Sequence, residues 1–121
     1  MLLTALHRGK VLGIRAGSAP HRIIGIWVVV VDGRVFVRSW GVNKTGWYHT
    51  WRKDPSGVMT APGRKRSIPV RAVPVRSARV KRAVSDAYAA KYNTPGSLKY
   101  VRDLAAKKCL DATLELVPAG T

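Results

Sequence analysis

Residues 26–40 read IWVVVVDGRVFVRSW and contain the clearest folding signal in the chain. The dipeptide Asp32-Gly33 separates two valine-rich runs, and it favours a two-residue turn because both positions tolerate a positive φ. The sequence therefore predicts a β-hairpin, with a buried strand over residues 23–31 and a return strand over residues 34–40. Alternation assigns the return strand to two faces: Val35, Val37 and Ser39 on one, and Phe36, Arg38 and Trp40 on the other.

The pattern on either side of this hairpin favours an α+β protein with a small, mostly antiparallel sheet or barrel. Pro69 and Pro74 predict that the strand containing them lies at an edge or is interrupted. Thr45 and Ser77 are candidate caps for two helices, and Pro95-Gly96 is expected to end the second of them. The remaining expected strands cover residues 10–15, 56–59, 68–75 and 112–117, and the expected helices cover 46–53, 78–92 and 98–108.

The composition indicates one globular domain, residues 1–121, with an unusually basic surface. The chain has 22 Lys and Arg against 6 Asp and Glu, a net charge of +16, and residues 55–85 contain no acidic side chain. Such a charge attracts polyanions in general, including nucleic acid. No apolar run approaches the length of a membrane-spanning helix, so no membrane association is expected. The single cysteine, Cys109, excludes an internal disulfide, and the expected compartment is the cytoplasm.

The common catalytic and nucleotide-binding motifs are absent. The chain contains no G-x-G-x-x-G after a strand, no phosphate-binding loop, no H-E-x-x-H and no G-x-S-x-G. The three histidines, His7, His21 and His49, are far apart in sequence, so their spacing indicates no metal site. The six acidic residues are scattered, and Cys109 is more typical of a half-buried structural thiol than of a nucleophile.

Residues 37–48 contain the best candidate for a binding site. They run from a strand end through a loop to a helix start, where free backbone N–H groups favour a phosphate. Arg38 and Lys44 add charge, and Trp40, Trp47 and Tyr48 are flat rings that can stack on a ligand. The hydrogen-bonding side chains of the segment are Ser39, Asn43 and Thr45. The alternative is that Trp47 and Trp51 are core residues and that Lys44 is a solvated loop charge.

Four segments resemble one family in the same order: IWVVVVDGRVFVRSW, TGWYHTWRKDPSG, VSDAYAAKYNTPG and LDATLELVP. The chain resembles the family catalogued as domain of unknown function 2255, which is similar to deazaflavin-dependent nitroreductases and to flavin-binding proteins related to pyridoxamine-phosphate oxidase. The resemblance implies a six-stranded antiparallel split β-barrel with flanking helices, usually a homodimer, with a deazaflavin coenzyme or FMN in a groove at the subunit interface.

The resemblance also implies roles for individual residues. Arg22, Arg38, Ser39, Lys44 and Thr45 would hold the cofactor phosphate. Trp47 and Tyr48 would pack against the cofactor ring, and Tyr48 and His49 are the candidate catalytic residues. The deazaflavin-binding proteins have an Arg-Lys pair in the loop between the first two strands, and residues 16–22 of this chain lack it.

Three functions follow from these observations. The first is a flavin- or deazaflavin-dependent reductase of nitro or quinone compounds. The second is a barrel without a flavin that binds another small ligand, or performs acid–base chemistry, in the same groove. The third is a nucleic-acid-binding module, indicated by eight basic and no acidic residues over positions 62–82.

Overall fold

The hairpin predicted around Asp32-Gly33 is confirmed. The computed structural model describes residues 9, 11–18, 23–39, 46–61, 67–105 and 107–119. Asp32 and Gly33 have φ values of 52° and 75° and connect β3 (Val29–Val31) to β4 (Arg34–Arg38). Val31 pairs with Arg34 and Val29 with Phe36, so the two-residue turn fixes the register of the hairpin.

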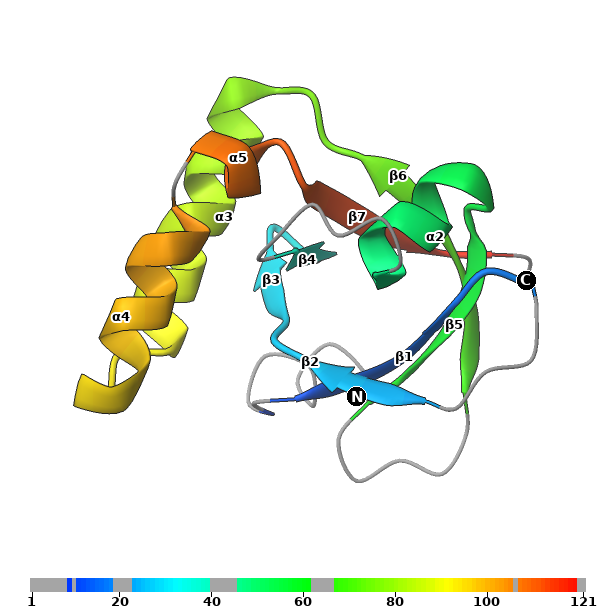
Figure 1. Cartoon of the computed structure of the whole chain (residues 1–121), viewed down its shortest axis with the longest axis horizontal. Coiled ribbons are helices and arrows are strands. Elements are labelled where there is room, and N and C mark those ends of the chain that lie inside the picture. The colour runs from blue at the N-terminus through cyan, green and yellow to red at the C-terminus, as the bar shows by residue number, and fades with distance from the viewer. Residues whose placement is uncertain are drawn as a thin grey trace.

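Seven described strands form one antiparallel sheet, where the sequence resemblance implied six. The sheet order is β2-β1-β5-β6-β7-β4-β3, and the sheet curls into a half-barrel (Figure 1). Beyond the hairpin, its strands are β1 (Leu12–Ala16), β2 (Ile24–Ile26), β5 (Ser56–Thr60), β6 (Ile68–Pro74) and β7 (Thr113–Pro118). The α+β class is confirmed.

The additional strand arises because residues 23–31 do not form one buried strand. They form β2 and β3, which occupy opposite edges of the sheet and are separated only by Trp27 and Val28. The edges of the sheet are therefore consecutive in the chain, which explains why the sheet curls back toward itself. The expectation of burial holds for Val28 and Val29 but is wrong for Ile24, which is 37% exposed because β2 is an edge strand, and for Ile23 just before it, which is 48% exposed.

The prolines of β6 do not place that strand at an edge. β6 lies between β5 and β7, so this prediction is wrong. Both prolines lie near the strand ends, where a missing N–H removes little pairing. The carbonyl of Pro69 still accepts a hydrogen bond from the backbone N–H of Ala119 at 2.9 Å, and Pro74 lies beyond the residues of β6 that pair with β5.

The described helices are α2 (Trp47–Lys53), α3 (Ala78–Lys91), α4 (Pro95–Leu104) and α5 (Lys107–Leu110). The Ser77 cap is confirmed, since its hydroxyl accepts a hydrogen bond from the N–H of Val80 at 3.3 Å. Gly46 is the N-cap residue of α2, and the predicted cap, Thr45, lies outside the described residues. Pro95 begins α4 instead of ending α3, because proline fits the first turn of a helix, where its missing N–H has no partner to lose.

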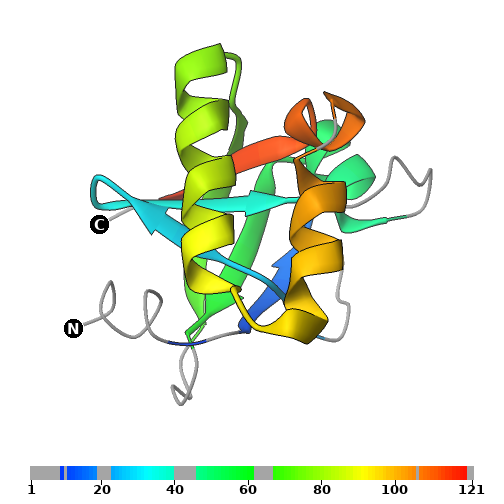
Figure 2. The same ribbon diagram turned by 90° about the vertical axis from the view of Figure 1, so that its left-hand side faces the viewer.

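Strand β4 separates two cores, as alternation predicts. Val35 and Val37 face the concave side of the sheet, where α2 adds the indole of Trp51. Phe36 faces the convex side, where it packs in one cluster with Val84 and Tyr88 of α3. Helices α3 and α4 lie side by side over this convex face (Figure 2). Leu114 and Leu116 of β7 belong to the same concave core as Val35 and Val37.

Candidate functional site

Arg38 is the residue of the expected binding segment with the most complete set of contacts. It ends β4 on the side of Phe36, beneath α3 and α4, and is only 5% exposed. Its Nε donates to Thr113 Oγ1 at 2.8 Å, and one terminal nitrogen donates to Lys81 O at 2.8 Å. The other terminal nitrogen donates to Ser85 Oγ at 2.7 Å and Leu104 O at 3.1 Å. This network joins β4, β7, α3 and α4.

All four acceptors of the Arg38 guanidinium are neutral. Burial lowers the pKa of Arg38, but a guanidinium stays protonated in proteins. A positive charge therefore lies beneath α3, and no carboxylate is among these four acceptors. A buried charge is stabilised when an opposite charge comes near it. The surroundings of Arg38 therefore favour an anion.

The residues expected to bind a flavin phosphate are not gathered into one exposed cradle in the described part of the chain. Arg38 is engaged by protein acceptors, and Ser39 is 8% exposed, with its N–H bonded to Ala112 O at 3.1 Å. These two residues do not fit direct phosphate contact. Three further members of the expected set, Arg22, Lys44 and Thr45, lie outside the described residues, as does Trp40.

Helix α2 carries the other expected site residues. The rings of Trp47 and Trp51 meet edge to face, with centroids 5.8 Å apart, so the two side chains share one face of the helix. Trp47 and Tyr48 are partly buried against the concave core. The hydroxyl of Tyr48 donates to Asp111 O at 3.1 Å, and His49 is half-buried on the same helix. Catalytic roles for Tyr48 and His49 stay predictions.

A pocket of about 430 Å³ lies between α3 and the segment from α4 to α5. Lys81 and Ser85, two hydrogen-bond partners of Arg38, are among the residues that line it. Its volume is within the range of about 300–1,000 Å³ typical of small-molecule sites. Ala105 and Leu110 make one wall mostly apolar, and α3 supplies the facing wall. The residues of α3 that line it follow a helical stripe: Ala78, Lys81, Arg82 and Ser85.

The polar groups of this pocket are linked to Arg38 and to Tyr48. Ser85 accepts from Arg38 and donates to Lys81 O at 3.1 Å. Lys81 Nζ forms an ion pair of 3.0 Å with Asp111, whose carbonyl oxygen also accepts from Tyr48. Among the described residues, Arg38, Lys81 and Arg82 carry three positive charges against the one carboxylate of Asp111, a net charge of about +2 that favours an anionic ligand.

The sequence interpretation missed Ser85 and Asp111 as site residues. It included Lys81 and Arg82 only in a basic run. The available signal was the spacing i, i+3, i+4, i+7 of residues 78, 81, 82 and 85, which places them on one helix face. The partners of that face, Leu110 and Asp111, follow about 25 residues later, and no local pattern connects them to it.

The described residues hold no group of three or more His, Cys, Asp and Glu side chains that could bind a metal ion. In the same part of the chain, every helix is too short or too polar to cross a membrane.

Comparison with known proteins identifies the family. A family model described as an uncharacterized protein conserved in bacteria (DUF2255) matches residues 8–116. The chain belongs to the DUF2255 family. No curated protein matches this DUF2255 chain in sequence.

A solved structure shares the fold of the DUF2255 chain. It is the crystal structure of the conserved hypothetical protein Rv2991 from Mycobacterium tuberculosis, with a TM-score of 0.61 and 13% sequence identity. The match covers 98% of this chain and 78% of that chain. At this identity the likeness concerns the arrangement of the backbone alone.

Proposed function

We propose that this DUF2255 protein binds a small phosphate-bearing molecule in the pocket between α3 and the α4–α5 segment. The observation that supports this proposal is the buried Arg38 guanidinium, whose four acceptors are all neutral and which reaches the pocket wall through Ser85 and Lys81. A bound phosphate would supply the missing negative charge, with direct contact to Arg82 and Lys81. The apolar part of the ligand would lie against Ala105 and Leu110.

A flavin or deazaflavin is one member of this ligand class. The family resemblance supports it, but the burial of Arg38 and Ser39 does not. Non-flavin ligands are therefore the better match to the described residues, in agreement with the second of the three functions. Reduction of nitro or quinone compounds, a split barrel of the flavin-binding type and a homodimer stay predictions from the resemblance.

The proposal is tested by titrating the purified chain with FMN, with the deazaflavin coenzyme and with AMP. Binding is measured by calorimetry and by visible absorption. We expect saturable one-to-one binding of at least one of them. Uptake of FMN or the coenzyme without AMP would favour the flavin function. Absence of binding by all three would overturn the proposal.

Arg82→Ala and Arg79→Ala form a matched pair for locating the phosphate. Both remove one positive charge from α3, but only Arg82 lines the pocket. We expect Arg82→Ala to weaken binding about tenfold, equivalent to about 1.4 kcal/mol, and Arg79→Ala to change it less than about twofold. Equal losses would indicate a diffuse basic surface. Binding to DNA that falls steeply with added salt would then favour the nucleic-acid function.

A further inference from the structure

The ion pair between Lys81 and Asp111 crosses the pocket between α3 and the α4–α5 segment. Lys81 belongs to α3, whereas Asp111 lies in the turn between α5 and β7, so the pair joins the two walls. Lys81 Nζ and Asp111 Oδ1 are 3.0 Å apart. In the described part of the chain, Asp111 is the one ion-pair partner of Lys81. Its carboxylate therefore occupies the amine that a bound phosphate would contact.

The two side chains of this ion pair differ in exposure. The side chain of Lys81 is 18% exposed, whereas that of Asp111 is 64% exposed. The backbone is held at both residues, since Lys81 O accepts from Arg38 and Ser85, and Asp111 O accepts from Tyr48. A rotation of the exposed Asp111 side chain therefore releases the amine of Lys81 while these backbone contacts stay in place.

The charges around the pocket favour an exchange of the Asp111 carboxylate for a phosphate. Arg82 also lines the pocket and is exposed, and it forms no ion pair with the described residues. A phosphate in place of the carboxylate contacts Lys81 and Arg82 together, because it has several acceptor oxygens. Asp111 opposes this exchange, because a group of the same chain competes for Lys81 at a high effective concentration.

We propose that Asp111 is an internal competitor at this anion site. Its carboxylate holds Lys81 when the pocket is empty and is displaced when the phosphate of a ligand binds. Asp111 acts on the same pocket as the proposed ligand, so this role rests on the proposed function. It adds the residue that limits the affinity, and with it a contact that changes between the empty and the occupied pocket.

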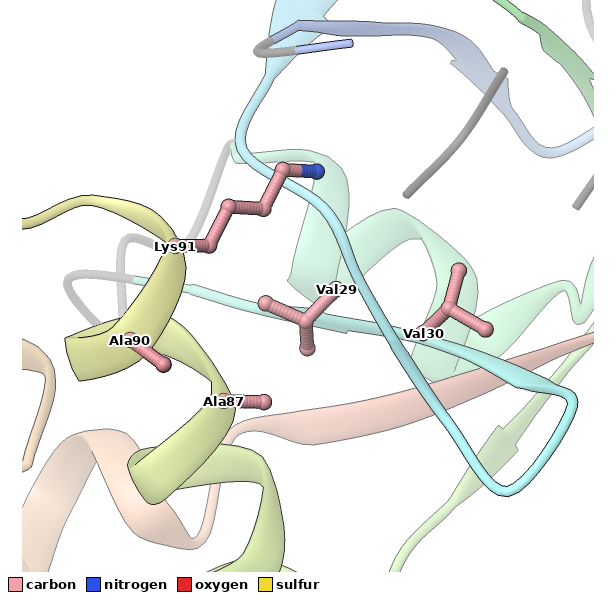
Figure 3. Close-up of a pocket in the computed structure, with 5 residues that line it drawn as sticks. All are labelled: Val29, Val30, Ala87, Ala90 and Lys91. Carbon is pink, nitrogen blue, oxygen red and sulfur yellow. The ribbon is translucent and has the colours of Figure 1, made fainter. Parts of the chain in front are cut away.

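A second pocket lacks this arrangement and provides a control. It lies between β3 and the C-terminal half of α3 and has a volume of about 220 Å³. None of its described lining residues is acidic, and Lys91 Nζ donates to Val28 O at 2.7 Å. Burial also lowers the pKa of Lys91 to about 8, which disfavours the charged amine. The lining residues are Val29, Val30, Ala87, Ala90 and Lys91 (Figure 3).

The competition is tested by calorimetric titration of the full-length chain with FMN, the deazaflavin coenzyme and AMP. Asp111→Asn removes the carboxylate but keeps the size of the side chain. Asp86→Asn makes the same change of charge at an exposed residue of α3 that does not line the pocket. We expect Asp111→Asn to tighten binding about fivefold and Asp86→Asn to change it less than about twofold. Equal gains would overturn the proposal, because the overall charge would then explain both.

The same change in a Lys81→Met background shows whether Asp111 acts through Lys81. Methionine keeps an unbranched side chain but has no charge, so Asp111 has no amine to hold. In this background we expect Asp111→Asn to change the affinity less than about twofold. A gain of about fivefold in both backgrounds would contradict competition for Lys81.

The remaining outcomes separate this role of Asp111 from the proposed function. Ala90→Leu fills the second pocket, and we expect it to leave the affinity unchanged. Loss of binding in Ala90→Leu would assign the ligand to that pocket and overturn the proposal. Binding by the wild type that Asp111→Asn does not tighten would overturn the role of Asp111 alone. Absence of binding by both proteins would overturn the proposed function as well.

Discussion

The indole ring of Trp27 lies parallel to the phenol ring of Tyr92, with the ring centroids 4.0 Å apart and the planes 4° apart. The Tyr92 hydroxyl also contacts both backbone groups of Val28, the residue after Trp27. It accepts from the N–H of Val28 at 3.1 Å and lies 3.2 Å from Val28 O. The hydroxyl of Tyr88 donates to Trp27 O at 3.3 Å. Side chains at the end of α3 therefore supply hydrogen-bond partners for the backbone groups between β2 and β3. These bonds stabilise the break that divides residues 23–31 into two strands.

Tyr92→Phe tests this arrangement. The substitution keeps the stacked ring but leaves the buried N–H of Val28 without its acceptor. We expect the free energy of unfolding to fall by about 1–3 kcal/mol, the typical penalty for an unsatisfied buried group. Urea denaturation followed by tryptophan fluorescence measures it. Tyr100→Phe is the comparison, because the side chain of Tyr100 is 45% exposed, and we expect a smaller loss than for Tyr92→Phe. A loss below about 0.5 kcal/mol in Tyr92→Phe would show that the Tyr92 hydroxyl is dispensable.

Thr113→Val tests the Arg38 network. Valine has nearly the same shape as threonine but cannot accept the hydrogen bond from Arg38 Nε. A buried guanidinium with an unpaired donor is costly, so we expect a loss of about 1–3 kcal/mol in unfolding free energy. The matched change Thr60→Val removes a hydroxyl that contacts only the exposed Ser67 side chain among the described bonds, and we expect an effect within about 0.5 kcal/mol. A stable Thr113→Val protein would contradict this account of Arg38.

Two glycine substitutions should have opposite effects on stability. A Cβ at Gly57 would lie 2.6 Å from the backbone oxygen of Arg15 and 2.5 Å from the indole nitrogen of Trp51, so β1 and β5 would have to separate. We expect Gly57→Ala to destabilise the fold by about 2–3 kcal/mol or more. A Cβ at Gly96 meets nothing within 4 Å, and this position is in the first turn of α4. We expect Gly96→Ala to be neutral or to stabilise by about 0.5 kcal/mol. Thermal denaturation of both variants checks the order.

The lowered pKa of Lys91 predicts a pH dependence of stability. Its folded pKa is about 8, whereas an unfolded lysine titrates near 10.4. Between these values the unfolded chain binds more protons than the folded chain, so the contribution of Lys91 to the free energy of unfolding increases with pH. Below about pH 8 the amine is protonated in both states, and the contribution is constant.

Comparison with Lys91→Met isolates this effect, because titration of Tyr88 and Tyr92 occurs in both proteins. We expect the difference in unfolding free energy, wild type minus variant, to be level from pH 6 to 7 and to rise from pH 8 to 10. Urea titrations at each pH provide the values. A difference that stays level to pH 10 would show that Lys91 has no lowered pKa.

Some elements follow from local sequence because their causes are local. The hairpin turn depends on two residues that accept positive φ, and the cap of α3 depends on a hydroxyl three positions before the N–H that it satisfies. The shared face of Trp47 and Trp51 likewise follows from their spacing of four residues on α2. Propensity, turn chemistry and periodicity act over a few residues, and one sequence contains all of that information.

The sequence by itself determined the α+β class, the hairpin at Asp32-Gly33, most helix and strand positions and the strongly basic charge. Only the tertiary structure decided that residues 23–31 break into two edge strands, because the groups that stabilise the break, Tyr88 and Tyr92, come from α3 more than 60 residues away. It also decided that Arg38 is buried and that Ser85 and Asp111 line one pocket. Hydrogen bonds and burial between distant segments leave no periodic signal in the chain, and they appear only when the sheet and helices pack together.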